Sequence, residues 1–226
     1  MTKQIQIAID GPAAAGKSTI AKKTAELLGY TYVDTGAMYR AITYKAIQLN
    51  IDLQDGEKLT SLLKETTIEL KPSPKGQLVF LDNQEVTDEI RSLKVTASVS
   101  QVAAHAHLRE EMVLRQLEMG KDGKIVMDGR DIGTHVLTNA ELKIFMSASV
   151  EERAKRRYLE NQKRGIDSVL KELAEEIALR DKMDSERDAS PLIQAEDAVF
   201  IDTTELTIEQ VSEKIMQLAK ERMQII

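Results

Sequence analysis

The segment GPAAAGKS, residues 11–18, constrains this chain more than any other. It satisfies the pattern G-x-x-x-x-G-K-[ST] at every defined position, although glycine weakens the interior of both strands and helices. The alternating run QIQIAID precedes it and the helical pattern STIAKKTAELLG follows it, which is the setting this motif requires. We therefore expect the loop amides and the positive end of the following helix to surround phosphate groups.

Each position of this loop has an expected part in holding a nucleoside triphosphate. Gly11 and Gly16 permit the tight fold, Lys17 can bridge the outer phosphates, and the Ser18 hydroxyl can help to hold Mg2+. The predicted ATP site is Gly11, Pro12, Ala13, Ala14, Ala15, Gly16, Lys17, Ser18 and Thr19, and Ser18 is the predicted metal residue. The alternative is a glycine-rich turn that merely begins a helix, which the intact motif in this setting disfavours.

Composition narrows the class of protein further. With 226 residues, of which 42% are hydrophobic, the chain can bury the core of one large domain. A formal net charge of -6 argues against a protein whose whole surface binds nucleic acid. The absence of cysteine excludes disulfides, thiolate zinc sites and cysteine nucleophiles. No apolar run approaches the length of a membrane span. We expect a cytoplasmic protein without nucleic-acid or membrane partners.

Five short apolar segments predict strands, and helical patterns separate most of them. The segments are residues 5–10, 30–34, 124–129, 142–148 and 198–203. This alternation predicts an α/β fold in which helices cover both faces of a parallel sheet. Residues 67–87 break the alternation with a strand, a Pro/Gly turn and a second strand, so they predict a small antiparallel insert outside the main sheet. Capping-box patterns at Ser149 with Glu152 and at Thr207 with Gln210 predict the starts of two late helices.

Three polar segments predict a second anionic site beside the loop. DTGAMYR (34–40) and DGRDIGT (128–134) follow predicted strands, and RDKMDSER (180–187) lies late in the chain. Ligands of an open α/β sheet bind beyond the carboxyl ends of its strands, so the first two segments should face the loop. The arginines that can gather around a second anionic ligand are Arg40, Arg130, Arg180 and Arg187. A basic stripe on the capped helix that starts near Glu151 is formed by Arg153, Arg156 and Arg157. Positioning, metal and positive charge supply most of the catalysis of phosphoryl transfer, which this set suits.

Other interpretations of the same residues stay open at this point. Each arginine run taken singly is equally well explained as a solvated helix face with surface ion pairs. Asp34 and Asp128 can organise magnesium-bound water or the loop, although Asp128 can also simply cap its turn. Switch GTPases, helicases, transporters and small-molecule kinases all possess such a loop, but this chain has no Asn-Lys-x-Asp guanine reader and no room for the tandem core of a helicase.

Five segments in the right order resemble bacterial cytidylate kinase: GPAAAGKST, DTGAMYR, SQVAA followed by LRE, DGRDIGT and RDKMDSERDASPL. The resemblance runs from about Ile5 to the final helix. It implies a P-loop kinase core with a five-stranded parallel sheet, formed as one domain of residues 1–226 and as a monomer. It further implies a nucleoside-monophosphate-binding lobe inserted over residues 36–100, and a helical lid with flanking helices over residues 151–187.

The resemblance also implies how the acceptor nucleoside is recognised. Ser100, Arg109 and Asp131 would read the cytosine ring, whose exocyclic amino group is a donor that a carboxylate can accept. Uracil carries an acceptor in place of that amino group, so Asp131 would repel it. Arg180 and Asp184 would hold the ribose.

The phosphate contacts implied by the resemblance use arginine throughout. Arg40 and Arg130 would hold the acceptor phosphate, and Arg187 would close onto the acceptor site. Arg156 and Arg157 match lid arginines that reach the transferred phosphate. The predicted catalytic residues are therefore Lys17, Arg130, Arg156, Arg157 and Arg187.

The implied reaction is transfer of the ATP γ-phosphate to CMP or dCMP, with Mg2+ as cofactor. One departure from the family is Thr35, a predicted substrate-binding residue that stands where many members have serine, so a hydroxyl is retained. The nearest rival is a kinase of the same core that acts on AMP, UMP or a sugar acid. A rival from another class is a nucleotide-dependent binding or switch module, in which an acceptor would not speed ADP release.

Overall fold

A computed structural model describes residues 4–74 and 76–224. Five strands form one parallel sheet in the order β2–β6–β1–β7–β8, which confirms the predicted fold class. These strands are β1 (Gln6–Asp10), β2 (Thr31–Asp34), β6 (Ile125–Gly129), β7 (Leu142–Ser147) and β8 (Val199–Asp202). Each lies within its predicted segment, because short apolar runs of β-branched residues are suited to a sheet buried on both faces.

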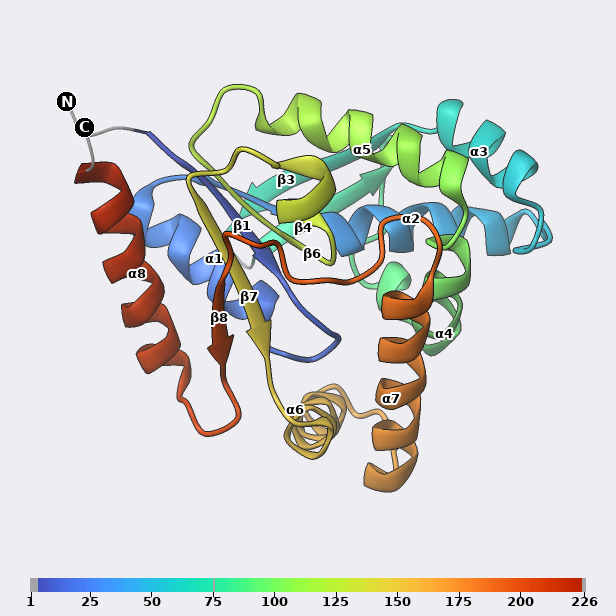
Figure 1. Cartoon of the computed structure of the whole chain (residues 1–226). Helices are drawn as coiled ribbons and strands as arrows, with labels where there is room; N and C mark the ends of the chain where they lie inside the picture. Colours follow the sequence, from blue (N-terminus) through green and yellow to red (C-terminus); the bar gives the residue numbers. More distant parts are fainter. Residues whose placement is uncertain (1–3, 75, 225–226) are drawn as a thin grey trace.

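Helices cover both faces of this sheet (Figure 1). On one face α1 and α8 bury Ile20 and Ile215 against β1, β7 and β8. On the other face the segment after β6 buries Val136, and α5 packs the half-buried Val113 against the same cluster. The helices are α1 (Lys17–Leu28), α2 (Thr35–Gln48), α3 (Gly56–Lys64), α4 (Leu93–Val102), α5 (Ala106–Gly120), α6 (Val150–Lys163), α7 (Leu170–Glu186) and α8 (Ile208–Gln224). No helix among the described residues is long and apolar enough to cross a membrane.

The predicted antiparallel insert is confirmed, with one more strand than expected. Its strands are β3 (Ile68–Ser73), β4 (Gly76–Leu81) and β5 (Gln84–Glu85), and a single turn of 3₁₀ helix follows at Glu89–Arg91. The insert forms a sheet of its own and packs on α2 to α5 through a core that includes Ile42, Leu63 and Val79. This second core holds the insert beside the main sheet.

The pair α6 and α7 lies at the end of the molecule toward which the arrowheads of β7 and β8 point (Figure 1). A small apolar cluster that includes Ala154, Leu173 and Ile177 packs between the two helices. The helix α6 begins with a Ser149 cap, since the Ser149 hydroxyl accepts a hydrogen bond from the Glu152 amide at 3.2 Å. The sheet therefore presents the carboxyl ends of its strands to a helical pair with a small core.

Candidate active site

The loop between β1 and α1 uses its two glycines for different reasons. Gly16 has a φ of 89°, and a Cβ there would meet only the far ends of the Arg156 and Met146 side chains, at 3.9 and 4.0 Å. Gly11 has a φ of 147°, and a Cβ there would collide with the Met146 carbonyl oxygen of β7. Gly16 is thus favoured by its left-handed backbone conformation, whereas Gly11 is required by the close approach of a neighbouring strand.

Lys17 opens α1 and is 6% exposed. Its Nζ donates a hydrogen bond to the Pro12 carbonyl oxygen at 2.7 Å, so the side chain folds back along the loop. Burial lowers the pKa of the Lys17 ammonium well below its ordinary value, and the charge of Arg130 acts in the same direction. An anion beside Lys17 would raise this pKa again, because a negative charge stabilises the charged ammonium form.

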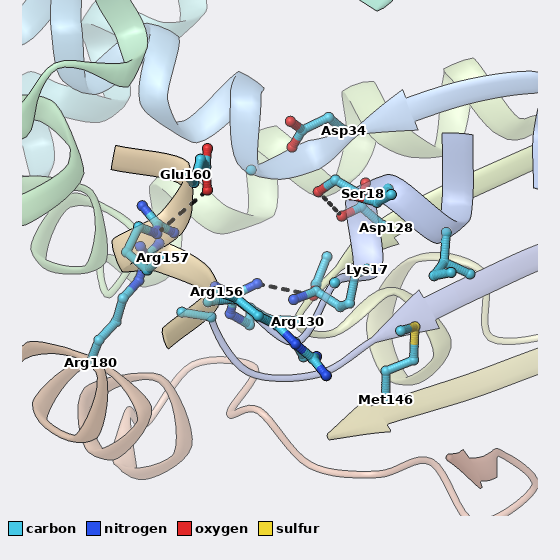
Figure 2. A pocket seen from close by; sticks show the side chains of 18 of the residues that line it. Lys17, Ser18, Asp34, Asp128, Arg130, Met146, Arg156, Arg157, Glu160 and Arg180 are labelled. Carbon is cyan, nitrogen blue, oxygen red and sulfur yellow. Dashed lines mark hydrogen bonds and ion pairs between the residues drawn. The ribbon is translucent and has the colours of Figure 1, made fainter. Parts of the chain in front are cut away.

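Oxygen atoms from β2, β6 and α1 meet beside the loop. The Ser18 hydroxyl donates to Asp128 Oδ2 at 2.8 Å, and the Tyr32 hydroxyl donates to Asp128 Oδ1 at 2.9 Å. Burial raises the pKa of the Asp128 carboxyl to about 6, and the nearby Asp34 adds to the rise. Asp34 and Asp128 are register partners on adjacent strands, and Figure 2 shows both close to Ser18.

Asp34 organises the start of α2. One carboxylate oxygen accepts from the Ala37 amide at 2.8 Å, and the other pairs with Arg40 at 2.8 Å and with Arg91 at 3.7 Å. Burial alone would raise the pKa of Asp34, but Arg40 and Arg91 outweigh it and the pKa is lowered. The sequence analysis did not select Arg91. It lies just after the insert, where no strand end or motif points to it.

Two of the three predicted base-reading residues, Arg109 and Asp131, form a buried ion pair. Arg109, which is 2% exposed, meets the Asp131 carboxylate at 2.5 Å and lies over the Tyr39 ring at 5.2 Å from its centroid. Arg187 approaches the other oxygen of Asp131 at 3.9 Å. Two guanidinium groups therefore face one carboxylate at this end of the cavity.

Asp184 of α7 is the centre of the neighbouring network. It accepts from the Ser100 hydroxyl at 3.2 Å and from Arg130 Nε at 2.8 Å, and it faces Arg180 at 4.0 Å and Arg187 at 3.9 Å. Burial would raise the pKa of Asp184, but Arg130 and Arg180 reverse the shift and lower it. Burial, with Arg130 next in effect, lowers the pKa of Arg180 to about 9.

The helix α6 contributes three arginines with different surroundings. Arg156 donates to the Thr203 carbonyl oxygen at 2.6 Å, and burial lowers the pKa of Arg157, whose charge faces Glu160 at 3.8 Å. Arg153, expected to share their basic stripe, is instead 4% exposed and pairs with Asp181 of α7 at 2.6 Å. Figure 2 shows Arg156 and Arg157 on the cavity side of α6.

These groups surround one cavity of about 740 Å³. Loop residues 13–19 line one part of it, while Gly11 and Pro12 are not among the lining residues described. The predicted acceptor and lid residues that also line it are Thr35, Arg40, Ser100, Arg109, Arg130, Asp131, Arg156, Arg157, Arg180, Asp184 and Arg187. Four arginines surround the carboxylates of Asp131 and Asp184, so that part of the cavity carries an excess of positive charge. These arginines are Arg109, Arg130, Arg180 and Arg187.

Two side chains hold the end of β6 and the loop that follows it. The Thr35 hydroxyl donates to the Asp128 carbonyl oxygen at 2.8 Å, so it supports the end of β6. Asp10, which the sequence analysis did not select, accepts from the Ile132 and Gly133 amides at 2.8 and 2.7 Å. Burial raises the pKa of Asp10 to about 7. Its position at the end of β1, next to the loop, is the one sequence signal that points to it.

Comparison with known proteins gives a consistent result. The family model described as cytidylate kinase matches residues 7–221. The cytidylate kinase of Lysinibacillus sphaericus is 67% identical over 223 residues, which cover 99% of this chain and 100% of that protein. The cytidylate kinase of Geobacillus kaustophilus is 60% identical over 222 residues, covering 98% and 99%.

A solved structure of an uncharacterized protein from Eubacterium ventriosum shares the fold, with a TM-score of 0.51 at 11% identity over 97% of this chain and 99% of that one. The sequence matches are much closer and span nearly the whole length of both proteins. Because the family model also covers most of the chain, including the loop and both halves of the cavity lining, this chain belongs to the cytidylate kinase family.

Proposed function

We propose that this member of the cytidylate kinase family transfers the γ-phosphoryl group of ATP to CMP or dCMP within the one cavity. The observation that carries the proposal is that the phosphate loop and the arginine–carboxylate network line the same space. An oxygen of the CMP phosphate attacks the γ-phosphorus, and the bond from that phosphorus to the bridging oxygen breaks, which releases ADP. The protein contributes position and positive charge, which suit this reaction.

The donor half consists of the loop and the side chains that reach over it. Lys17 would leave the Pro12 carbonyl oxygen and bind the outer phosphates of ATP, where its charge offsets theirs. Arg156 and Arg157 approach from α6, on the side of the cavity where the transferred group would lie. Guanidinium groups stabilise charge on equatorial phosphoryl oxygens as it redistributes in the transition state.

Mg2+ belongs to this proposal because the donor set fits it. The Ser18 hydroxyl and the carboxylates of Asp34 and Asp128 supply oxygen atoms, the ligand type that Mg2+ prefers. Across the described ranges, no group of three or more His, Cys, Asp or Glu residues could hold a metal by itself. This fits an ion that is bound partly by substrate phosphates and water. When bound, Mg2+ would offset phosphate charge on the Ser18 side of the cavity.

The acceptor half would recognise the base and the phosphate separately. Asp131, held by Arg109, accepts from the cytosine amino group and repels the O4 of uracil. Ser100 is the third base-reading residue, and its hydroxyl also bonds to Asp184. Arg180 and Asp184 bind the ribose in this proposal.

Three arginines serve the acceptor phosphate in the same proposal. Arg40 and Arg130 bind it from α2 and from the loop after β6, and Arg187 closes onto the acceptor site. A phosphate monoester carries up to about two negative charges at neutral pH, which this positive surface can accept. Arg91 also lines the cavity and lies 3.7 Å from Asp34, so its charge would add to that of the arginines that bind the acceptor phosphate.

The two peripheral parts of the chain serve as moving covers in this proposal. Residues 36–100 form the monophosphate-binding lobe and residues 151–187 form the lid with its flanking helices. Closure of the lid would exclude water that competes as phosphoryl acceptor. A monomeric state and a cytoplasmic location stay predictions.

The test is ADP release from ATP and Mg2+ with CMP, dCMP, UMP, AMP and GMP offered separately. We expect strong stimulation by CMP and dCMP and little by the others. Preferential stimulation by UMP or AMP would retain the kinase and discard the cytosine site. No stimulation by any acceptor would favour a nucleotide-dependent binding module.

A further inference from the structure

One side chain of the antiparallel insert is hydrogen-bonded to the main sheet. Gln77 of β4 donates from Nε2 to the Tyr32 carbonyl oxygen at 2.6 Å and accepts at Oε1 from the Asp34 amide at 3.1 Å. These backbone groups belong to β2, the edge strand of the parallel sheet. The side-chain amide of Gln77 thus bonds to two backbone groups at the carboxyl end of β2 that are two residues apart. A neighbouring strand would pair with the same two groups.

The backbone that Gln77 holds carries the Asp34 side chain, which lines the cavity. The Asp34 carboxylate caps α2 at the Ala37 amide and pairs with Arg40 at 2.8 Å. Arg40 in turn lines the cavity. A continuous series of short contacts therefore runs from Gln77 through Asp34 to Arg40.

Gln77 is not needed to attach the insert to the molecule. Val79 and Leu81 are buried in the core shared with α2 to α5. Lys45 of α2 also pairs with Asp82 at 2.5 Å and donates to the Thr66 hydroxyl at 2.7 Å. None of these contacts has Asp34 as a partner, so they attach the insert without bonding to the end of β2.

We propose that Gln77 is a positioning residue for the acceptor phosphate, acting through the Asp34 backbone on the Arg40 guanidinium. The inference rests on the proposed function, because it takes Arg40 as a phosphate contact. It gives the insert a role in catalysis: one of its side chains fixes the geometry of the acceptor site from outside the cavity, since Gln77 itself is not among the described lining residues.

The test uses two variants of similar length. Gln77→Glu replaces the donor to the Tyr32 carbonyl oxygen by an acceptor, and Gln77→Met removes both hydrogen bonds. We expect each to raise the KM for CMP by about five- to ten-fold, as expected for one to two lost hydrogen bonds. The kcat and the KM for ATP should change less than about two-fold. Gln84→Met, at an exposed position of β5 in the same insert, is the matched control and should leave all three constants unchanged.

A double-mutant cycle distinguishes positioning from a general effect on folding. If Gln77 acts through Arg40, the Gln77→Met effect on the KM for CMP should shrink in an Arg40→Lys background, whereas independent effects would add. Thermal melting tests whether each variant is folded. If Gln77→Met does not fold, the cycle is measured with Gln77→Glu instead.

Three results would overturn the inference: an unchanged KM for CMP in folded variants, an equal rise in the KM for ATP, or additive effects in the cycle. Wild-type protein is assayed in parallel with each acceptor. Failure of CMP to stimulate the wild type would refute the proposed function, whereas normal wild-type activity with unaffected variants would refute only the role of Gln77.

Discussion

Replacing Asp131 by asparagine tests the base-reading part of the site most directly. The side chain is 4% exposed and is held between Arg109 at 2.5 Å and Arg187 at 3.9 Å. Asp131→Asn retains the shape but removes the negative charge. A carboxylate only accepts hydrogen bonds, whereas an amide also donates, so the variant can face the O4 of uracil without repulsion.

The structure sets the scale of two separate effects. Loss of a good polar base contact changes discrimination by about 1–3 kcal/mol, or about five- to 150-fold in the ratio of kcat/KM for CMP over UMP. At an effective dielectric of about 20, the attraction across the 3.9 Å to Arg187 is about 4 kcal/mol. Because two buried guanidinium groups lose their partner, we expect the free energy of unfolding to fall by up to about 3–5 kcal/mol.

Steady-state assays with CMP and UMP give the ratio, and urea unfolding gives the stability. Asp122→Asn, at an exposed position after α5, is the matched control and should change neither quantity. A folded Asp131→Asn protein with the wild-type ratio of CMP to UMP would refute the assignment of Asp131 as base reader. A lower stability with an unchanged ratio would leave Asp131 a purely structural residue.

Other predictions concern the loop and the strand before it. Lys17→Ala should lower kcat severely with little change in far-UV circular dichroism, and near-normal turnover would contradict its assigned role. Gly11→Ala should destabilise the fold by about 1–3 kcal/mol or more in urea unfolding, because the new Cβ meets the Met146 carbonyl. An unchanged midpoint would show that β7 can move away. Burial raises the pKa of Asp10 to about 7 from an unfolded value of 3.8, so its contribution to stability is fully present below about pH 4 and is lost as the pH rises through about 7. Asp10→Asn should flatten the dependence of the unfolding free energy on pH over that window, and an unchanged slope would refute this assignment.

The local patterns of the sequence predicted most of the fold because they act over a few residues. The loop with its flanking strand and helix, the five strands and the caps at Ser149 and Thr207 were all confirmed. The capping box at Ser149 is only half formed, since the Glu152 carboxylate bonds to Arg156 at 3.1 Å. A pattern of four residues cannot show which of two nearby partners a side chain takes.

The family resemblance, together with the rule that ligands bind at strand ends, predicted a set of acceptor residues but not the contacts that these residues make. Ser100 and Asp184 are 84 positions apart in the chain, and their hydrogen bond exists only because α4 and α7 meet at the cavity. For Arg153 the prediction was wrong, because this arginine was expected on a basic surface stripe and is instead buried against Asp181. Periodicity gives the face of a helix, whereas the packing of another helix decides whether that face is exposed.

The sequence by itself determined the phosphate loop, the alternation of strands and helices and the set of arginines that phosphoryl transfer needs. Tertiary structure alone decided why Gly11 must be glycine, how Gln77 reaches the edge of β2 and which carboxylate each arginine meets. Turn, cap and periodicity signals are encoded by residues close in the chain. The contacts of a buried charged network join residues that only the completed sheet and its helices bring together. Because these groups are buried, leaving any one of them without its partner costs free energy.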